Sequence, residues 1–213
     1  NSKNYQILNL NLNTQKSEFG AFMIDQDKGS IFYLGNQKYI RKKIKSTNQI
    51  YNLYKTEIDT STFKTKSANE LNIRFNSIYQ DGPISLNPVT KMLYLTRTTS
   101  KVRKIKNIQL AIFQIPYDKF GKELPKLLEL NFDDYSSIHP TISADGKVLY
   151  FSSDRPGGYG GMDLYSVNIE DDKIAGEITN MGPDINTEKD EVFPFIFSDK
   201  YLFYSSNKTS NQK

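Results

Sequence analysis

The sequence contains no cysteine and no tryptophan, and it has a single histidine, His139, among 213 residues. Without cysteine the chain has no disulfide bond, no thiolate nucleophile and no cysteine-ligated metal site. One histidine excludes multi-histidine metal sites and leaves little capacity for general acid–base catalysis. We therefore expect neither enzymatic activity nor a bound cofactor or transition metal, and we expect a structural role for His139.

Long hydrophobic stretches are also lacking. The longest apolar run, Phe193 to Phe197, is interrupted by Pro194, whereas a membrane-spanning helix needs roughly 18 apolar residues. Any membrane attachment is therefore expected to depend on parts outside this chain. The composition, with 37% hydrophobic and 24% charged residues, is typical of one globular domain that buries a substantial core.

Positive charge is only mildly in excess, because 28 basic and 24 acidic residues leave a net charge of +4. Two clusters hold much of this excess. They consist of Arg41, Lys42, Lys43 and Lys45, and of Lys101, Arg103, Lys104 and Lys106. Such clusters are typical of solvated hairpin tips, and they are also candidate contacts for an acidic polymer. Few aromatic residues lie near them to stack on bases, so nucleic acid is not the expected partner.

One sequence pattern occurs four times, and its clearest copy spans Ser137 to Ile169. This copy contains an extended segment, an Asp-Gly turn at 145–146, a strand ending in aromatic residues, and a glycine-bearing loop. An Asp-Gly pair between apolar runs is a strong signal of a β-hairpin. The other copies begin at Ala21, Gly82 and Phe193.

The repeat spacing is that of a propeller blade. Aligning Tyr33, Tyr94, Tyr150 and Phe203 gives spacings of 61, 56 and 53 residues, and we expect these four at matching places on second strands. A further strand recurs between the copies, beginning at Tyr5, Ile50, Ile108 and Met162. Four-stranded units at such a period predict an all-β fold, a β-propeller of four-stranded antiparallel blades.

The phase of the repeat predicts one propeller region over residues 1–213, belonging to a larger propeller of five or six blades. Residues 1–17 are expected to form an outer strand of a preceding or closing blade. Blades are expected over 18–78, 79–134 and 135–187, with the first two strands of a further blade over 188–213. Within the second blade, residues 122–130 are expected to form a loop, because Pro125 opposes a helix, with Leu127 and Leu128 packed inward.

A glycine-rich segment connects two strands of the third copy and is a candidate structural loop. It contains Asp154, Arg155, Gly157, Gly158, Gly160, Gly161 and Asp163. A phosphate-binding glycine loop opens a helix, whereas here a strand follows. We expect the glycines to supply positive φ in a wide hairpin, and the two aspartates to accept backbone N–H bonds at its ends. No metal site is assigned, because the spacing of calcium-binding loops is absent.

The later half of the chain resembles a known repeat family. The stretches LNFDDYSSIHPTISADGKVLYFSSDRPGGYGGMDLY and ITNMGPDINTEKDEVFPFIFSDKYLFYSSN resemble the TolB-like, WD-like propeller repeats of Bacteroidetes OmpA-family envelope proteins. The best-known members are PorE-type lipoproteins of the type IX secretion system. The family's usual tryptophan between blades is missing here.

The resemblance implies a non-catalytic scaffold or protein-interaction propeller in the periplasm, associated with the outer membrane. Its expected partners are other envelope or secretion-system proteins. Two alternatives stay open: a binder of an anionic polymer or nucleic acid through the lysine- and arginine-rich loops, and a regulatory propeller of a larger hydrolase. Binding of a sugar or another small ligand in the central channel is also left open.

Overall fold

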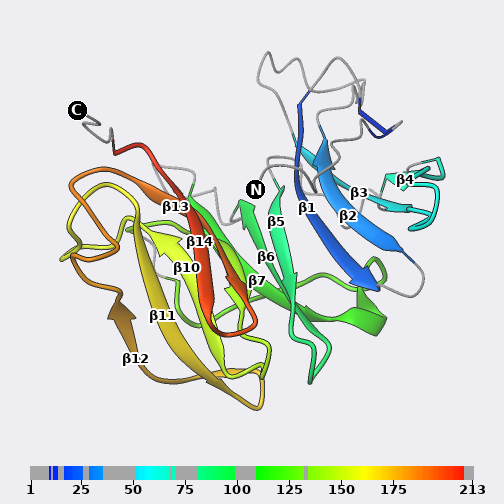
Figure 1. Cartoon of the computed structure of the whole chain (residues 1–213). Coiled ribbons are helices and arrows are strands. Elements are labelled where there is room, and N and C mark those ends of the chain that lie inside the picture. Colours follow the sequence, from blue (N-terminus) through cyan, green and yellow to red (C-terminus); the bar gives the residue numbers. More distant parts are fainter. Residues whose placement is uncertain are drawn as a thin grey trace, which may run out of the picture.

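The computed structural model describes residues 10, 12–13, 17–25, 29–35, 51–67, 69–70, 81–98, 109–131 and 134–208. These residues form β-strands and one short 3₁₀ helix, η1 (Tyr117–Lys119). No helix in this part of the chain is long and apolar enough to cross a membrane. The strands make three four-stranded antiparallel sheets and one two-stranded sheet (Figure 1).

We name the sheets the first to fourth blades in chain order. The first blade contains β1 (Glu18–Asp25), β2 (Ser30–Gly35), β3 (Asn52–Glu57) and β4 (Asn69–Glu70). The second contains β5 (Asp81–Leu86), β6 (Met92–Thr98), β7 (Leu110–Pro116) and β8 (Lys126–Leu127). The third contains β9 (Ser137–Ile142), β10 (Val148–Ser153), β11 (Asp163–Glu170) and β12 (Lys173–Asn180). The fourth contains β13 (Glu191–Phe197) and β14 (Tyr201–Ser206).

The blades are arranged around a common axis. Within each blade the strands pair in chain order, so the first strand always lies at one edge. The first strands pack against one another, β5 against β1 and β9, and β9 against β13 (Figure 1). The prediction of an all-β propeller with four-stranded antiparallel blades is thus confirmed, and the described residues form part of such a propeller.

Polar turns close the hairpins between first and second strands and also join neighbouring blades. In the third blade, Asp145 accepts a 3.0 Å bond from the backbone N–H of Lys147, and Gly146 adopts a φ of 75° that favours glycine. In the second blade, Asn87 accepts bonds from the N–H groups of Val89 and Thr90. The Asn87 amide also donates a 3.0 Å bond to the Gly146 carbonyl. One asparagine therefore shapes its own turn and holds the next blade.

The hydrophobic core lies between the blades. Facing residues of the first and second blades form one cluster: Phe32, Leu34, Leu53, Ile84, Leu93, Leu95 and Ile115. Facing residues of the second and third blades form most of another, which includes Tyr94, Ile112, Leu128, Leu149, Phe151, Tyr165 and Val167. We call the face that a blade turns to the next blade its forward face, and the opposite one its back face. Because each blade buries both faces only against neighbours, stability depends on stacking of the blades.

The strand register corrects one of the four aligned aromatic residues. Tyr94, Tyr150 and Phe203 do occupy matching places on the second strands, where they pair with Ser85, Thr141 and Phe195 of the first strands respectively. In the first blade the residue at this place is Phe32, which pairs with Phe22. Tyr33 is therefore one position off and lies on the back face. Because Phe32 and Tyr33 are both aromatic, the sequence alignment did not reveal this shift of one residue. Such a shift moves a side chain to the opposite face of the sheet.

The segment over residues 122–130 also differs from the expectation. Lys126 and Leu127 form the short strand β8, which pairs with β7 at Phe113 and Gln114. Leu128 is buried as expected, but Leu127 is 43% exposed. Successive residues of a strand point to opposite faces, so only one of the two leucines reaches the core.

Candidate functional site

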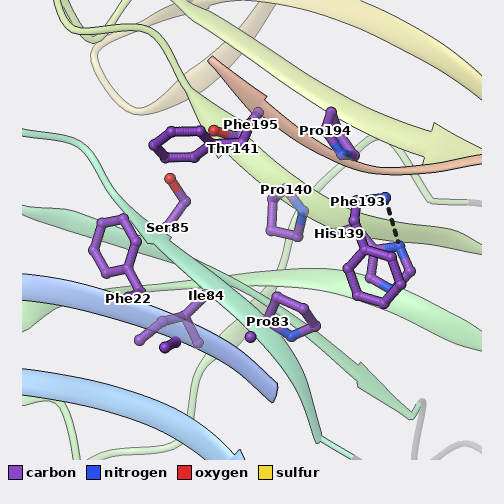
Figure 2. Close-up of a pocket in the computed structure, with 12 residues that line it drawn as sticks. Phe22, Pro83, Ile84, Ser85, His139, Pro140, Thr141, Phe193, Pro194 and Phe195 are labelled. Atoms are coloured by element: carbon purple, nitrogen blue, oxygen red, sulfur yellow. Dashed lines mark hydrogen bonds between the residues drawn. The ribbon is translucent and has the colours of Figure 1, made fainter. Parts of the chain in front are cut away.

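A cavity of about 220 Å³ lies on the propeller axis, between the first strands of all four blades. Each blade contributes three consecutive residues, at 20–22, 83–85, 139–141 and 193–195. Figure 2 shows these side chains converging from β1, β5, β9 and β13. The lining is mainly apolar, with three phenylalanines and three prolines, and it includes the hydroxyls of Ser85 and Thr141 and the ring of His139.

A bulge in each first strand brings these residues to the axis. The pairing of first and second strands shifts register at this point in all four blades. Gly20, His139 and Phe193 occupy the same place in the bulge and have φ values of 62°, 56° and 54°. Such a left-handed conformation is strained for residues other than glycine, and it turns the N–H group out of the strand ladder.

The turned N–H groups bind the preceding blade. The His139 N–H donates a 2.8 Å bond to the Thr96 hydroxyl, and the Phe193 N–H donates a 3.3 Å bond to Nδ1 of His139. The rings of His139 and Phe193 also stack, with centroids 3.7 Å apart (Figure 2). His139 therefore joins the second, third and fourth blades at the edge of the cavity.

The imidazole of His139 is held in its neutral form. Burial lowers its pKa to about 4, because the charged ring would lose hydration there. Since Nδ1 accepts the bond from Phe193, the ring proton lies on Nε2. A base whose accepting nitrogen is already bonded is poorly suited to removing a proton from a substrate.

The hydroxyls of Ser85 and Thr141 also accept backbone N–H bonds from the following blade. Oγ of Ser85 accepts a 3.2 Å bond from the N–H of Ile142, and Oγ1 of Thr141 accepts a 3.4 Å bond from the N–H of Ile196. Each hydroxyl still has its own proton to donate. Both therefore connect adjacent blades and can offer a hydrogen bond to a group in the cavity.

The cavity has an uncharged lining and a small volume. None of its twelve described lining residues is a carboxylate, an amine or a guanidinium. Its volume of about 220 Å³ is below the roughly 300–1,000 Å³ typical of small-molecule sites. It can hold a large apolar side chain and satisfy a few acceptors next to it.

Comparison with solved structures places this architecture among known folds. TolB from Acinetobacter baumannii aligns with 94% of this chain at 15% identity, with a TM-score of 0.57. The chain has a TolB-like β-propeller fold. Puromycin hydrolase aligns with 90% of the chain (15% identity, TM-score 0.54), and an endo-arabinase from Bacteroides thetaiotaomicron with 91% (14% identity, TM-score 0.52). No family model and no curated protein matches the sequence.

The likeness covers only part of these proteins. The chain spans 40% of the A. baumannii TolB and 28% of the puromycin hydrolase, but 72% of the endo-arabinase. At such low identity the likeness concerns the fold alone.

In this TolB-like propeller the glycine-rich loop is held by its two aspartates and by Arg155. Asp154 accepts a 2.6 Å bond from the N–H of Ser136. Asp163 accepts bonds from the N–H groups of Tyr159 and Gly160. The Arg155 guanidinium lies 4.8–5.0 Å from the ring centroids of Tyr135, Phe151 and Tyr165. These contacts fix the ends of the loop and leave its tip exposed.

The glycines of this loop act differently from the expectation. Only Gly157 has a positive φ, 88°. The other three are required by close approach, since a Cβ would collide with the Asp163 carboxylate at Gly158, with backbone carbonyls of the next connection at Gly160, and with the Asp190 carboxylate at Gly161. The expectation of positive φ at Gly158, Gly160 and Gly161 was therefore wrong.

The two basic clusters lie outside the described residues, so their arrangement stays a prediction. This applies to Arg41, Lys42, Lys43, Lys45, Lys101, Arg103, Lys104 and Lys106. Within the described ranges, no group of three or more His, Asp or Glu side chains could hold a metal ion.

Sequence reasoning left ligand binding in the central channel open but did not identify the residues that line the axial cavity. A signal for it existed, because a proline recurs near the start of three repeat copies, in Gly82-Pro83-Ile84, His139-Pro140-Thr141 and Phe193-Pro194-Phe195. Proline removes a backbone donor and is confined to edges and bulges of sheets. Its recurrence near the start of three copies therefore indicates an edge strand facing a shared space.

Proposed function

We propose that the chain is a non-catalytic protein-interaction or scaffold propeller of a Gram-negative cell-envelope protein. It acts in the periplasm, in association with the outer membrane, and its partners are other envelope or secretion-system proteins. The activity resembles that of the PorE-type lipoproteins of type IX secretion. Attachment to a membrane depends on parts outside this chain.

The observation that carries the proposal is the axial cavity. Buried apolar pockets that receive one large side chain are the usual anchoring points of protein interfaces. The hydroxyls of Ser85 and Thr141 and Nε2 of His139 are donors, which suits the backbone carbonyls beside such an anchor. The partner segment is therefore expected to be apolar at its anchor and free of charge there.

The likeness to TolB and the repeat motifs of the third and fourth blades support the envelope location. The structural likeness supports the fold component of the proposal, and the motifs resemble a group of envelope proteins. The same fold also occurs in puromycin hydrolase, so the location needs its own test.

Site-specific photo-crosslinking tests the proposal. A photo-reactive phenylalanine analogue replaces Phe195, which lines the cavity, or Leu124, a 70% exposed residue of the second blade. Both variants are expressed in a Gram-negative host that carries the proposed type of secretion system. We expect the Phe195 variant to form an adduct with one envelope protein, and the Leu124 variant to form none with it. Absence of an adduct at Phe195, or the same adducts from both positions, would contradict the proposal.

A further inference from the structure

A cleft of about 690 Å³ lies between the second and third blades. Three segments line it: the β5–β6 turn, the β9–β10 turn, and the end of β11 with the β11–β12 turn (Figure 1). Its volume falls within the roughly 300–1,000 Å³ typical of ligand sites. Both blades that form it have all four strands, and it shares no lining residue with the axial cavity.

Carboxylates predominate in this cleft, which we call the acidic cleft. Its charged lining residues are four acids and one lysine: Asp145, Glu170, Asp171, Asp172 and Lys147. Within the described part of the chain, none of the four acids forms an ion pair. The nearby Lys91 ammonium instead donates a 2.8 Å bond to the Pro88 carbonyl. The lining therefore has an excess of negative charge, which attracts a cationic group.

Hydrogen bonds hold the acids of the acidic cleft in place. The Thr90 hydroxyl donates a 2.6 Å bond to Oδ1 of Asp172 and so joins the two blades. Asp145 accepts a 2.6 Å bond from the Ser143 hydroxyl and a 3.0 Å bond from the Lys147 N–H, and these bonds lower the pKa of Asp145. A charged site that is already ordered loses less conformational freedom when it binds a ligand.

The Tyr94 hydroxyl is a second indication of a ligand. Tyr94 is fully buried, and its hydroxyl has no hydrogen-bond partner among the described residues. Two residues of the acidic cleft lie beside it, since burial and then the Asp172 carboxylate raise the pKa of Tyr94, whereas the Asn87 amide acts in the opposite direction. That amide itself donates to the Gly146 carbonyl. A buried polar group without a partner costs free energy, which a group entering the cleft would recover.

Packing of the blades does not require this hydroxyl. Phe32 and Phe203 occupy the matching place in the first and fourth blades. A ring without a hydroxyl therefore fills this position of the fold. The oxygen of Tyr94 is a candidate contact for a ligand and not a packing group.

The lining favours an organic cation over a metal ion. In the part of the chain that the structure describes, no group of three or more His, Asp or Glu side chains could hold a metal ion. Val89, Val148 and Ile169 add apolar surface that suits the hydrocarbon stem of a basic side chain. An arginine guanidinium has five donors in one plane and can bond to a carboxylate and a neutral oxygen together, whereas a lysine ammonium is a point charge.

We propose that the acidic cleft binds a basic segment of a partner protein and takes up one of its arginine side chains. The guanidinium bonds to the Asp172 carboxylate and to the Tyr94 oxygen, and its stem packs on Val89 and Val148. Further basic residues of the segment face the other carboxylates. This site is independent of the axial cavity, so photo-crosslinking at Phe195 neither supports nor contradicts it.

Fluorescence anisotropy with the full 213-residue chain tests the proposal. The probe is a fluorescent tetra-arginine peptide at low salt. A tetralysine peptide separates recognition of arginine from attraction of charge, and a tetracitrulline peptide has the shape of the probe without its charge. We expect saturable binding of the arginine peptide, about fivefold weaker binding of the lysine peptide and none of the citrulline peptide. In NMR spectra, the amide signals of 145–147 and 169–172 should shift with the arginine peptide.

Variants of the chain locate the contact. Asp172→Asn keeps an oxygen for the Thr90 hydroxyl but removes one charge, so it should weaken binding about tenfold. Asp184→Asn is the matched control, because it removes the same charge from an exposed residue outside the acidic cleft, and it should leave binding unchanged. Tyr94→Phe should weaken binding about fivefold without lowering the melting temperature, a result that a merely structural hydroxyl would not give.

Three outcomes would overturn the proposal: no saturable binding of the arginine peptide at millimolar concentration, equal losses in Asp172→Asn and Asp184→Asn, or binding that neither Asp172→Asn nor Tyr94→Phe changes. Self-association at low salt that the arginine peptide does not displace would identify a second copy of the chain as the occupant and would also overturn it. If Asp172→Asn fails to fold, Tyr94→Phe and the three peptides on the unchanged chain still decide the matter.

Discussion

At the scale of single residues, His139 has the most consequential environment. It adopts a left-handed backbone conformation, its N–H binds Thr96, and its Nδ1 accepts the N–H of Phe193. The bond from Phe193 requires the neutral ring, because a protonated Nδ1 would be a second donor. The only histidine of the chain therefore links the protonation state of one side chain to the attachment of the fourth blade.

This link predicts a pH-dependent stability. Burial lowers the pKa of His139 from 6.5 to about 4, so the folded state binds its proton less readily than the unfolded state. The contribution is complete above pH 6.5 and is lost as the pH falls towards 4. The loss amounts to about 3 kcal/mol in the free energy of unfolding. Urea denaturation at a series of pH values measures it.

The variant His139→Asn is the matched control, because its amide oxygen can accept the same N–H, it does not titrate, and asparagine tolerates positive φ. Its stability should stay flat between pH 6.5 and 4, apart from the onset of carboxylate protonation near pH 4. A wild-type chain whose stability is equally flat in this interval would show that the ring is not buried in this way.

At the scale of elements, the connections between strands do more than reverse the chain. The loop between β10 and β11 approaches the connection between β12 and β13 so closely that Gly160 lies against the carbonyls of Thr187 and Lys189, and the Gly161 N–H donates a 3.0 Å bond to the Lys189 carbonyl. The third blade is thereby tied to the segment that leads into the fourth.

Two glycine substitutions in this loop should differ in cost. Gly160→Ala should lower the free energy of unfolding by about 2–3 kcal/mol, because the new Cβ meets backbone atoms that cannot rotate away. Gly157→Ala should cost only about 1 kcal/mol, since its Cβ would meet no atom and only the positive φ of 88° opposes it. Chemical denaturation of both variants under one condition decides the order, and equal losses would contradict the close approach.

At the scale of the whole molecule, the propeller topology predicts the placement of the two basic clusters. Both fall between second and third strands of adjacent blades, and such connections emerge on the same side of a propeller. Together they would form one positive field acting over about 8–10 Å at ordinary salt. An acidic partner or polymer approaching that side would be attracted to it.

Replacing Lys42, Lys43, Arg103 and Lys104 by serine tests this field. We expect weaker binding of a polyglutamate probe at low salt and a flatter dependence of binding on salt concentration, with the melting temperature nearly unchanged. Four serine replacements of lysines outside the clusters, at Lys91, Lys122, Lys173 and Lys189, are the matched control. If the cluster variant binds as the unchanged chain does at every salt concentration, the charged face has no role.

The fold class could be predicted from the sequence, because turn chemistry and the alternation of polar and apolar residues are local and occur four times. The Asp-Gly turn at 145–146 and the strand that follows it required no knowledge of distant contacts. The exact register in which β2 pairs with β1, by contrast, could not be predicted from the local sequence. Phe32 and Tyr33 are both aromatic, and only pairing with β1 across a bulge showed which one faces the second blade.

The candidate site depended on the tertiary structure. The axial cavity combines three residues from each of four blades, and no local pattern states that segments more than fifty residues apart meet at one axis. The same is true of His139, whose partners Thr96 and Phe193 lie 43 and 54 residues away. The sequence by itself thus determined which segments form strands, whereas packing of the blades decided which residues share a cavity and which glycines are indispensable.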